Sequence, residues 1–443
     1  MKVIINHHLQ VLSVDNENKI KLLNINEYGN YILFDNNNFF VSGRECFFCC
    51  RSGEVIVSTR QDYFPITTGF CGEEQIYFSL NGGFLSSDTS SIFIQPFCGD
   101  WEKFYLLDEK KLQIIRNCFA KGCYIQGSNV YLPPEEIIQN KNGIKFGKYN
   151  IKIENIIKSI KTESNRIIFF RDNLGIIIIK PFNPLVYLTC FGGSDIISSA
   201  EESIYSLFHF GDFIGEVLII TDNENISFSE KLLPFMGRIH FQKSNAYDFF
   251  DFTLSRYMIS NISEMINYSP IMYMDCDIII NSNINEVFHD SMKIDKILFS
   301  EEYRLSESSP WFGGEHWKEV GKDYKLMQSG INSGIFVFNS IDAAKEILIS
   351  VVQSMINSQK TKHSRSKIIL ETLDQPNLNY VLMAHFPSCF DTEKLTSYVF
   401  HGSGGCFSDI PTLGFAHFNG GLGNFESRLE LMRNYVKYIE NKN

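Results

Sequence analysis

The chain has 443 residues, a formal net charge of −11 at pH 7 and 44% hydrophobic residues. This length predicts two or three domains with substantial cores, and the composition is typical of a globular protein rather than a disordered one. The acidic balance argues against a nucleic-acid backbone as the main partner. Phosphate backbones are bound by clustered Lys and Arg residues, and the sequence has no long basic run.

The sequence offers no segment suited to secretion or to crossing a membrane. Its longest apolar region, residues 166–190, is interrupted by Arg171, Asp172 and Lys180 and falls short of the ~20 apolar residues that a membrane span needs. We therefore expect a cytoplasmic protein without a transmembrane segment, which leaves peripheral membrane contact open. The 11 cysteines show no repeated pair spacing of the kind that holds zinc, so reduced thiols are expected.

Residues 1–150 contain short segments of alternating apolar and polar character, such as NYILFD, EVIVSTR and QIYFSL, separated by Gly, Asn and Asp. This pattern predicts an all-β domain. A weak repeat links VLSVDNENKIKLLNINEYGNYILFD with FLSSDTSSIFIQPFCGDWEKFYLLD, because both have Leu-Ser near the start and aromatic and aliphatic residues before a final Asp. The repeat resembles the fascin-like or lectin-like β-trefoil families, and a β-sandwich accounts for the pattern equally well.

From residue 183 onward the spacing of hydrophobic residues along the sequence changes. PLVYLTCFGG has the character of a buried strand with a Gly turn, SSAEESIYSLFHF has helical spacing, and GEVLIITDNEN is a second strand that ends in polar residues. Repeated alternation of strands and helices predicts an α/β domain over residues 183–443, with a mostly parallel sheet covered by helices on both faces. Residues 151–182 are predicted to connect the two domains.

The stretch SPIMYMDCDIIINSN places two aspartates, Asp275 and Asp277, at the end of a predicted buried strand. Side chains two residues apart in a strand point the same way, and ligands of open α/β sheets bind beyond the carboxyl ends of the strands. Two carboxylates that face one site suit Mg²⁺ or Mn²⁺, which prefer oxygen ligands and keep positions free for phosphate. A purely structural role is the alternative, with Asp275 ending the strand and Asp277 capping a turn.

Three further polar signals follow in the sequence. QSGINSGIFVFN places Asn332 before an apolar strand, TLDQPNLNY places Asp374 at the start of a predicted helix, and GFAHFNGGLGN places His417 beside a Gly-rich turn. Taken singly, these residues are compatible with a turn residue, a helix N-cap and a core histidine. Their combination and order favour a functional site.

Together these motifs resemble glycosyltransferase family 8, the retaining transferases of GT-A fold that include glycogenin-like and bacterial galactosyltransferases. The resemblance covers residues ~183–435 and implies a Rossmann-like GT-A catalytic domain. Its motifs are Asp275-Cys276-Asp277, Asn332-Ser333-Gly334, the DQPNLN sequence at 374–379, and His417 followed by Gly420.

The resemblance implies a site for a UDP-sugar and a divalent cation. The implied metal ligands, for Mn²⁺ or Mg²⁺, are Asp275, Asp277 and His417. The implied catalytic residues, which hold the donor sugar or lie near its reacting face, are Asn332, Asp374 and Gln375. The residues implied to contact the nucleotide are Thr189, Cys190, Asp222, Arg256, Asp275, Cys276, Asp277, Gly334 and Gly420.

One departure from the family pattern concerns the diphosphate. The family's His motif usually continues to Lys-Pro-Trp, whereas this chain has GGLGNF after Asn419. Backbone amides of residues 420–423, or Arg256, are then expected to offset the diphosphate charge. The resemblance implies a metal-dependent hexosyltransferase that acts with retention, and the departure keeps a second hypothesis open, a weak or inactive protein that binds glycans or nucleotide sugars.

The acceptor is not specified by the sequence, and a glycan, a glycolipid or a protein are all compatible. A stretch of about 30 residues at 301–330 is longer than an ordinary connection and suggests a lid or a binding loop. Trp311 and Trp317 in this stretch suit either stacking on a sugar ring or packing of the loop onto the domain.

Overall fold

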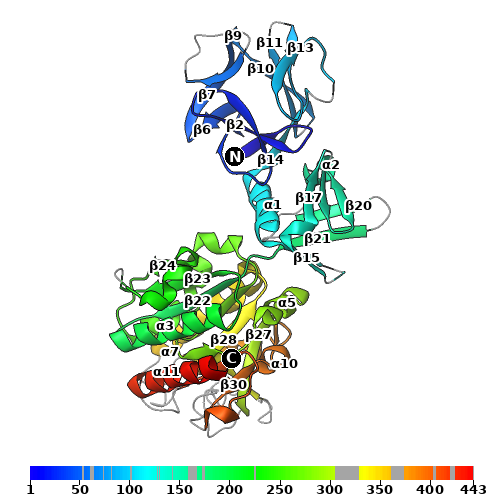
Figure 1. Ribbon diagram of the computed structural model, residues 1–443. Helices are drawn as coiled ribbons and strands as arrows, with labels where there is room; N and C mark the ends of the chain where they lie inside the picture. The colour runs from blue at the N-terminus through cyan, green and yellow to red at the C-terminus, as the bar shows by residue number, and fades with distance from the viewer. Residues whose placement is uncertain are drawn as a thin grey trace. The chain divides into compact units, whose positions relative to one another are not determined.

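The computed structural model divides the chain into two compact units, Met1–Phe182 and Asn183–Asn443 (Figure 1). It describes all residues except 52–53, 60–63, 73, 81, 100–101, 127, 129, 142, 158–166, 172–174, 224–225, 305–328, 361–373, 403–405, 420–424 and 443. Trp311, Trp317 and Gly420 therefore lie outside the described residues. No helix in the described ranges is both long and apolar enough to span a membrane.

The N-terminal unit is built mainly from antiparallel strands. Its largest sheet has 14 strands, whose longest path runs β13-β12-β11-β14-β1-β5-β6-β7-β8. The strands are β1 Lys2–Ile5, β2 Gln10–Val14, β3 Ile20–Asn24, β4 Asn30–Tyr31, β5 Leu33–Asp35, β6 Asn38–Val41, β7 Arg44–Arg51, β8 Glu54–Ser58, β9 Phe64–Pro65, β10 Thr67–Gly72, β11 Gln75–Leu80, β12 Gly83–Ser87, β13 Ile92–Gln95 and β14 Phe104–Asp108. This arrangement agrees with the predicted β-rich character but does not establish a β-trefoil.

The rest of this unit contains helices α1 and α2 and two smaller sheets, ordered β16-β15-β21-β20 and β17-β18-β19. Their bounds are α1 Glu109–Lys121, β15 Cys123–Gln126, β16 Val130–Leu132, η1 Pro134–Glu136, β17 Ile137–Asn140, β18 Gly143–Phe146, β19 Tyr149–Lys152, α2 Ile153–Ile157, β20 Ile167–Arg171 and β21 Gly175–Pro181. The prediction of a purely β-stranded region over 1–150 missed α1, which the Asp108 carboxylate caps by accepting a hydrogen bond from the Lys110 amide.

The C-terminal unit is an α/β structure around one seven-stranded sheet, ordered β24-β23-β22-β25-β28-β27-β29. Strands β22 to β25 pair in parallel, and β28 runs antiparallel to both β25 and β27. A second sheet, ordered β26-β31-β30, has three strands. The strands are β22 Leu185–Cys190, β23 Glu216–Thr221, β24 Ile239–Lys243, β25 Ile271–Met274, β26 Ile278–Ile280, β27 Ile297–Arg304, β28 Ser329–Phe338, β29 Phe390–Asp391, β30 Val399–His401 and β31 Phe415–His417.

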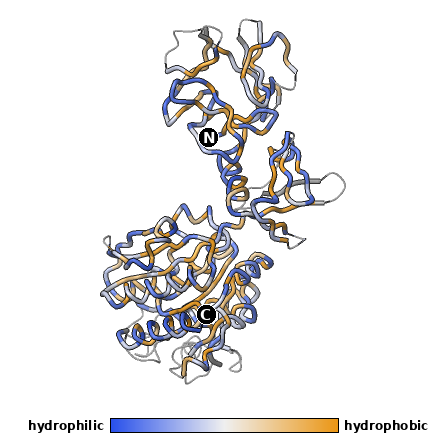
Figure 2. The backbone as a smooth tube through the Cα atoms, in the orientation of Figure 1, coloured by the Kyte–Doolittle hydropathy of each residue, from blue (hydrophilic) through white to orange (hydrophobic). Residues whose placement is uncertain are grey.

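Helices cover this sheet, and the buried strands are the most hydrophobic part of the unit (Figure 2). One apolar cluster packs α7 and α9 against the large sheet, and a second packs α11 against β26 and β31. The helices are α3 Ser194–His209, η2 Glu230–Arg238, α4 Phe249–Ser255, η3 Met258–Asn261, η4 Ser263–Asn267, α5 Asn285–Lys293, α7 Ile341–Lys360, α9 Gln375–His385, α10 Glu393–Thr396, η5 Phe407–Asp409 and α11 Phe425–Lys442.

Candidate metal and donor-sugar site

The Asp275–Asp277 segment connects β25 of the large sheet to β26 of the small sheet. Strand β25 ends at Met274, so both carboxylates lie in the connection rather than within the strand as predicted. The backbone is fixed on both sides, because the Asp275 amide donates to the carbonyl of Gly334 at 2.8 Å and the Phe418 amide donates to the carbonyl of Asp277 at 2.8 Å. These bonds hold the segment between β28 and the end of β31.

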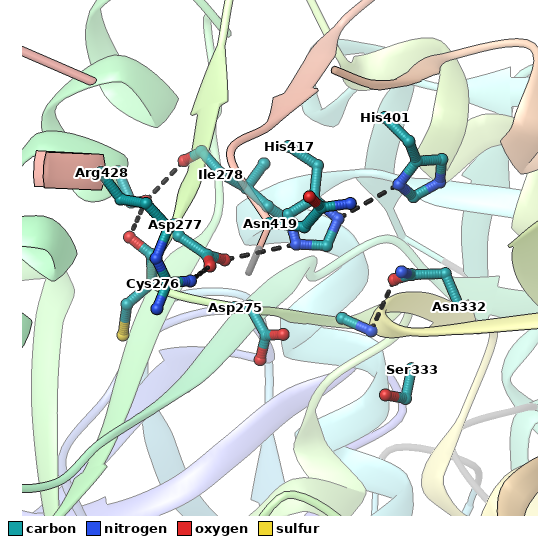
Figure 3. Close-up of polar contacts among 12 residues, drawn as sticks. Asp275, Cys276, Asp277, Ile278, Asn332, Ser333, His401, His417, Asn419 and Arg428 are labelled. Carbon is teal, nitrogen blue, oxygen red and sulfur yellow. Dashed lines mark hydrogen bonds and ion pairs between the residues drawn. The ribbon is translucent and has the colours of Figure 1, made fainter. Parts of the chain in front are cut away.

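His417, at the end of β31, completes a cluster with the two aspartates (Figure 3). Strand β31 pairs with β26 so that His417 lies opposite Ile278, which brings its ring beside Asp277. The Nε2 atom of His417 lies 3.3 Å from Oδ1 of Asp277. One ligand atom from each of Asp275, Asp277 and His417 lies within 4.8 Å of the others. The three residues that the resemblance implied as metal ligands are therefore brought together.

The charged groups of the cluster change one another's pKa values. Burial opposes ionisation of Asp277, but contact with His417 and the charge of Arg428 outweigh it and lower the pKa of Asp277. Burial likewise opposes the charge of His417, but contact with Asp277 outweighs it and raises the pKa of His417. For Asp275, burial dominates over the nearby Arg256 and raises the pKa. The raised pKa of His417 and the lowered pKa of Asp277 both favour an imidazolium–carboxylate pair when no cation is bound.

Two arginines from different helices contact the two aspartates. Arg256, at the C-terminal end of α4, lies 3.4 Å from Asp275 through Nη2. Arg428 of α11 forms an ion pair with Oδ2 of Asp277, and only 10% of its side chain is exposed. Arg428 was not predicted from the sequence, since 151 positions separate it from Asp277 and no motif marks it. Each carboxylate thus has its own guanidinium neighbour.

Gly334 lies beside the cluster, where a larger residue would collide with the polar side chains around it. A Cβ atom added to this glycine would lie 2.7 Å from Oδ2 of Asp275, 2.9 Å from Cε1 of His417 and 3.0 Å from Oδ1 of Asn332. The same Asn332 oxygen accepts a hydrogen bond from the Gly334 amide at 2.7 Å. A glycine is therefore required at this position of β28 so that the three polar groups can surround it.

Asp374 and Gln375 lie at the start of α9 and reach toward β28. Asp374 accepts hydrogen bonds from Nη1 of Arg256 at 2.8 Å and from the Tyr257 hydroxyl at 3.0 Å. Oε1 of Gln375 accepts from the backbone amide of Ser333 at 3.2 Å. The predicted residues of the 374–379 motif are therefore joined through Arg256 and Ser333 to the segments that carry the acidic cluster.

Glu302 of β27 is a carboxylate that the sequence reasoning missed. Its Oε2 accepts a hydrogen bond from the side-chain amide of Asn332 at 2.8 Å, and its Oε1 accepts one from that of Asn419, also at 2.8 Å. Its charge helps to raise the pKa of His417. Because its two hydrogen-bond donors come from two other segments, β28 and the residues after β31, only the folded structure identifies it.

His401 of β30 is the second histidine of the site. Its Nδ1 lies 3.2 Å from Nδ1 of His417, and its Nε2 lies 3.1 Å from Oγ of Ser300. Burial, followed by the charge of His417, lowers the pKa of His401 to about 3, so its ring is neutral near pH 7. No motif in the sequence marks this residue, because a single His in a short strand is common.

Thr189 and Cys276, two of the residues expected to contact the nucleotide, lie next to the cluster. Oγ1 of Thr189 is 3.2 Å from the Tyr273 hydroxyl, which in turn donates to Asp275. The Cys276 thiol donates to the Thr189 carbonyl at 3.2 Å. These contacts support the segment that carries Asp275.

Cys190 and Asp222 stand at the ends of β22 and β23. Cys190 is buried beside Cys276, and its thiol contributes to raising the pKa of Cys276. Asp222 is exposed and makes no polar contact with the cluster among the residues that the structure describes. Gly420 falls in the undescribed range and is not placed.

The donor set fits a divalent cation. It offers two carboxylates and one imidazole, a combination suited to Mn²⁺ and also able to take Mg²⁺. Oδ1 of Asp277 is buried and accepts no hydrogen bond within the described ranges, since its 3.3 Å contact with His417 falls short of hydrogen-bond geometry. The missing side chain of Gly334 leaves the space between the ligand atoms free.

Comparison with known proteins gives a family match and many similar solved structures, of which two examples follow. Residues 205–388 match the glycosyl transferase family 8 model, whereas no curated protein matches the chain. The apo structure of the bifunctional glycosyltransferase WbbM is 11% identical, with a TM-score of 0.37, and the alignment covers 59% of this chain and 51% of that one. Apo mouse xyloside xylosyltransferase 1 is 16% identical, with a TM-score of 0.39, over 55% of this chain and 99% of that one.

The family match confirms the resemblance that the motifs indicated. It spans Arg256, both aspartates, Asn332 and the start of α9, while His417 lies beyond its end. A family 8 domain implies the GT-A fold, in agreement with the α/β architecture of this unit. Residues 205–388 of the C-terminal unit are therefore similar to glycosyl transferase family 8.

Proposed function

We propose that this protein transfers a hexose from a UDP-sugar to a hydroxyl group of a glycan, glycolipid or protein acceptor, with help from Mn²⁺ or Mg²⁺. The observation that carries the proposal is the convergence of Asp275, Asp277 and His417 around Gly334, in a unit that is similar to family 8. Similarity to the family supports glycosyl transfer, and the donor set supports metal dependence.

Asp275, Asp277 and His417 are the residues that would hold the cation. When bound, it supplies positive charge for the departing diphosphate, so that no proton donor is needed at the leaving group. The chain supplies further positive charge through Arg256 and Arg428, which already contact the carboxylates. Arg428 is a candidate to compensate for the missing lysine of the family's Lys-Pro-Trp sequence, because it occupies the first turns of the helix that follows that position.

Asn332, Asp374 and Gln375 are proposed to orient the donor sugar. The Asn332 amide is held by Glu302, and Asp374 is held by Arg256 and Tyr257, so both side chains are ordered before a ligand binds. None of the described side chains stands out as a nucleophile suited to a covalent glycosyl intermediate. This favours retention by front-face attack, in which the acceptor hydroxyl adds on the side of the leaving diphosphate and gives its proton to a diphosphate oxygen.

A second candidate is a protein that binds nucleotide sugars or glycans with little or no turnover. The observation that favours it is the GGLGNF sequence, which replaces the Lys-Pro-Trp segment. Both candidates predict binding of UDP, and they differ in turnover.

The distinguishing experiment is a panel of UDP-hexoses incubated with the full chain and Mn²⁺, with released UDP as the readout. Asp277→Asn serves as the inactive comparison, and Asp248→Asn serves as a matched control, because Asp248 caps α4 and Asn also caps helices. Mn²⁺-dependent UDP release by the wild type and the control, but not by Asp277→Asn, supports the transferase. Tight UDP binding without release favours the binding protein, and absence of both contradicts the proposal.

A further inference from the structure

We propose that His401 is a positioning residue that fixes the ring orientation of His417 by accepting a hydrogen bond from its Nδ1–H group when Nε2 serves as a metal ligand. The inference rests on the proposed function, because it concerns the same metal site. It goes further by assigning a role to a histidine and a serine that belong to none of the family motifs in the sequence.

Strand pairing places the two histidines side by side. Strand β30 runs parallel to β31, and their register sets His401 directly opposite His417. Residues opposite each other on neighbouring strands project from the same face of a sheet, so the two rings meet, with centroids 5.3 Å apart and planes at 61°. The register of the two strands therefore places both rings on one face, where they can meet.

The hydrogen-bond chemistry then restricts the tautomers. A contact between two Nδ1 atoms at 3.2 Å needs a proton on one nitrogen and a lone pair on the other. A metal-binding Nε2 of His417 must present its lone pair, which leaves the proton on Nδ1. Nδ1 of His401 must then be the acceptor, and the proton of the neutral His401 ring resides on Nε2.

Ser300 provides the partner that this tautomer of His401 requires. Its Oγ lies 3.1 Å from Nε2 of His401 and comes from β27, 101 positions away in sequence. Ser300 is fully buried, so water does not replace it readily. A hydroxyl can accept as well as donate, so the chain Ser300–His401–His417 can hold His417 whether Nε2 faces a cation or forms the ion pair with Asp277. Metal-bound histidines commonly use such a partner on the other ring nitrogen, and its loss typically costs about 10- to 100-fold in metal affinity.

The test is titration of the full chain with Mn²⁺, with free Mn²⁺ followed by its electron paramagnetic resonance signal. His401→Asn keeps a polar acceptor close to the Nδ1 position, whereas His401→Leu has a similar size and no polar atom. We expect His401→Leu to weaken Mn²⁺ binding by about 10-fold or more, and His401→Asn to stay within about threefold of the wild type. His289→Leu is the matched control, because His289 is partly buried on α5 and contacts Glu286 instead of the cluster.

The outcomes separate this inference from the proposed function. If the wild type binds no Mn²⁺, the metal site itself is wrong. If the wild type binds and His401→Leu binds equally well, or if Asn and Leu weaken binding to the same extent, the positioning role is wrong. A merely structural role would lower the melting temperature without metal and leave Mn²⁺ affinity unchanged. Should His401→Leu fail to fold, Ser300→Ala provides the test. Weaker Mn²⁺ binding by about 10-fold supports the chain Ser300–His401–His417, and an affinity within about threefold of the wild type overturns it.

Discussion

A Cβ atom on Gly334 would lie 2.7 Å from Oδ2 of Asp275, closer than such atoms approach one another in folded proteins. Cε1 of His417 and Oδ1 of Asn332 also lie close to the added Cβ atom, so moving this atom away from Asp275 would not relieve the crowding. We therefore expect Gly334→Ala to displace Asp275 and weaken Mn²⁺ binding by at least about 10-fold, since overpacking of this kind costs about 1–3 kcal/mol. Calorimetric titration with Mn²⁺ measures the effect.

Gly237→Ala is the matched control for this substitution. Its added Cβ would have no neighbour within 4 Å, so the variant should bind Mn²⁺ like the wild type. Unchanged affinity in Gly334→Ala would show that the cation, if bound, does not use the space between Asp275 and His417.

Asp277→Asn should abolish metal-dependent UDP binding and turnover while the protein remains folded. The substitution removes one anionic ligand, and it leaves Arg428 beside a neutral amide that can still accept a hydrogen bond. UDP binding with and without Mn²⁺, together with a melting curve, tests this directly. Turnover at the wild-type rate would rule out Asp277 as a metal ligand.

Metal binding and metal-free stability should respond to pH in opposite directions. The pKa of His417 is raised in the folded protein by Asp277, whereas an unfolded His titrates near pH ~6.5. The stabilising imidazolium–carboxylate pair is fully present below the unfolded pKa and is lost as the pH rises through the raised folded pKa. A cation needs the neutral ring, so Mn²⁺ affinity should increase over that same rise.

Melting temperatures at pH 6 to 9, with and without Mn²⁺, measure both trends. His417→Gln removes the titrating ring and should flatten both curves while weakening Mn²⁺ binding. If the Mn²⁺-induced rise in melting temperature is independent of pH in the wild type, His417 is not a ligand.

The sequence predicted the residues of the site that lie in local motifs. Asp275 and Asp277 follow a run of apolar residues, and Asn332 and Asp374 lie near the start of a strand and a helix. The spacing of hydrophobic residues and the polar residues at the ends of these segments were therefore sufficient to find them. His417 was found in the same way, because it ends a short apolar segment beside glycines. The sequence therefore singled out these residues, and the family resemblance implied the ligand role of His417, which the structure places beside Asp275 and Asp277.

The residues that were missed depend on contacts between distant segments. Arg428 reaches Asp277 only because α11 packs on β26 and β31, and His401 reaches His417 only through the β30–β31 register. The Glu302 carboxylate accepts hydrogen bonds from two side-chain amides that belong to other segments. Helix α1 was missed for a different reason, since its short helical pattern lies among many strand-like segments, where local period gives a weak signal.

Glu302→Gln should impair turnover more than metal binding. The carboxylate accepts hydrogen bonds from the amides of Asn332 and Asn419, and a glutamine can accept from only one of them through its oxygen while its own NH₂ group opposes the other. We expect kcat/KM for UDP-sugar to fall by about 10-fold, which corresponds to the loss of roughly 1.4 kcal/mol, with Mn²⁺ affinity nearly unchanged. Glu301→Gln is the neighbouring control, because Glu301 contacts Thr392. Equal losses of kcat/KM in both variants would show that Glu302 only stabilises β27.

Residues 183–443 should fold and bind Mn²⁺ without the N-terminal unit. Among the residues that the structure describes, the apolar clusters of the C-terminal unit are formed by residues between Leu185 and Ile439, and those of the N-terminal unit by residues between Val3 and Ile179. A fragment that keeps its complete core is expected to unfold cooperatively by itself. We predict that it melts in one transition and binds Mn²⁺ within about threefold of the full chain, since all three candidate ligands lie within it. An insoluble fragment, or one that melts without cooperativity while the full chain is stable, would show that the two units depend on each other to fold.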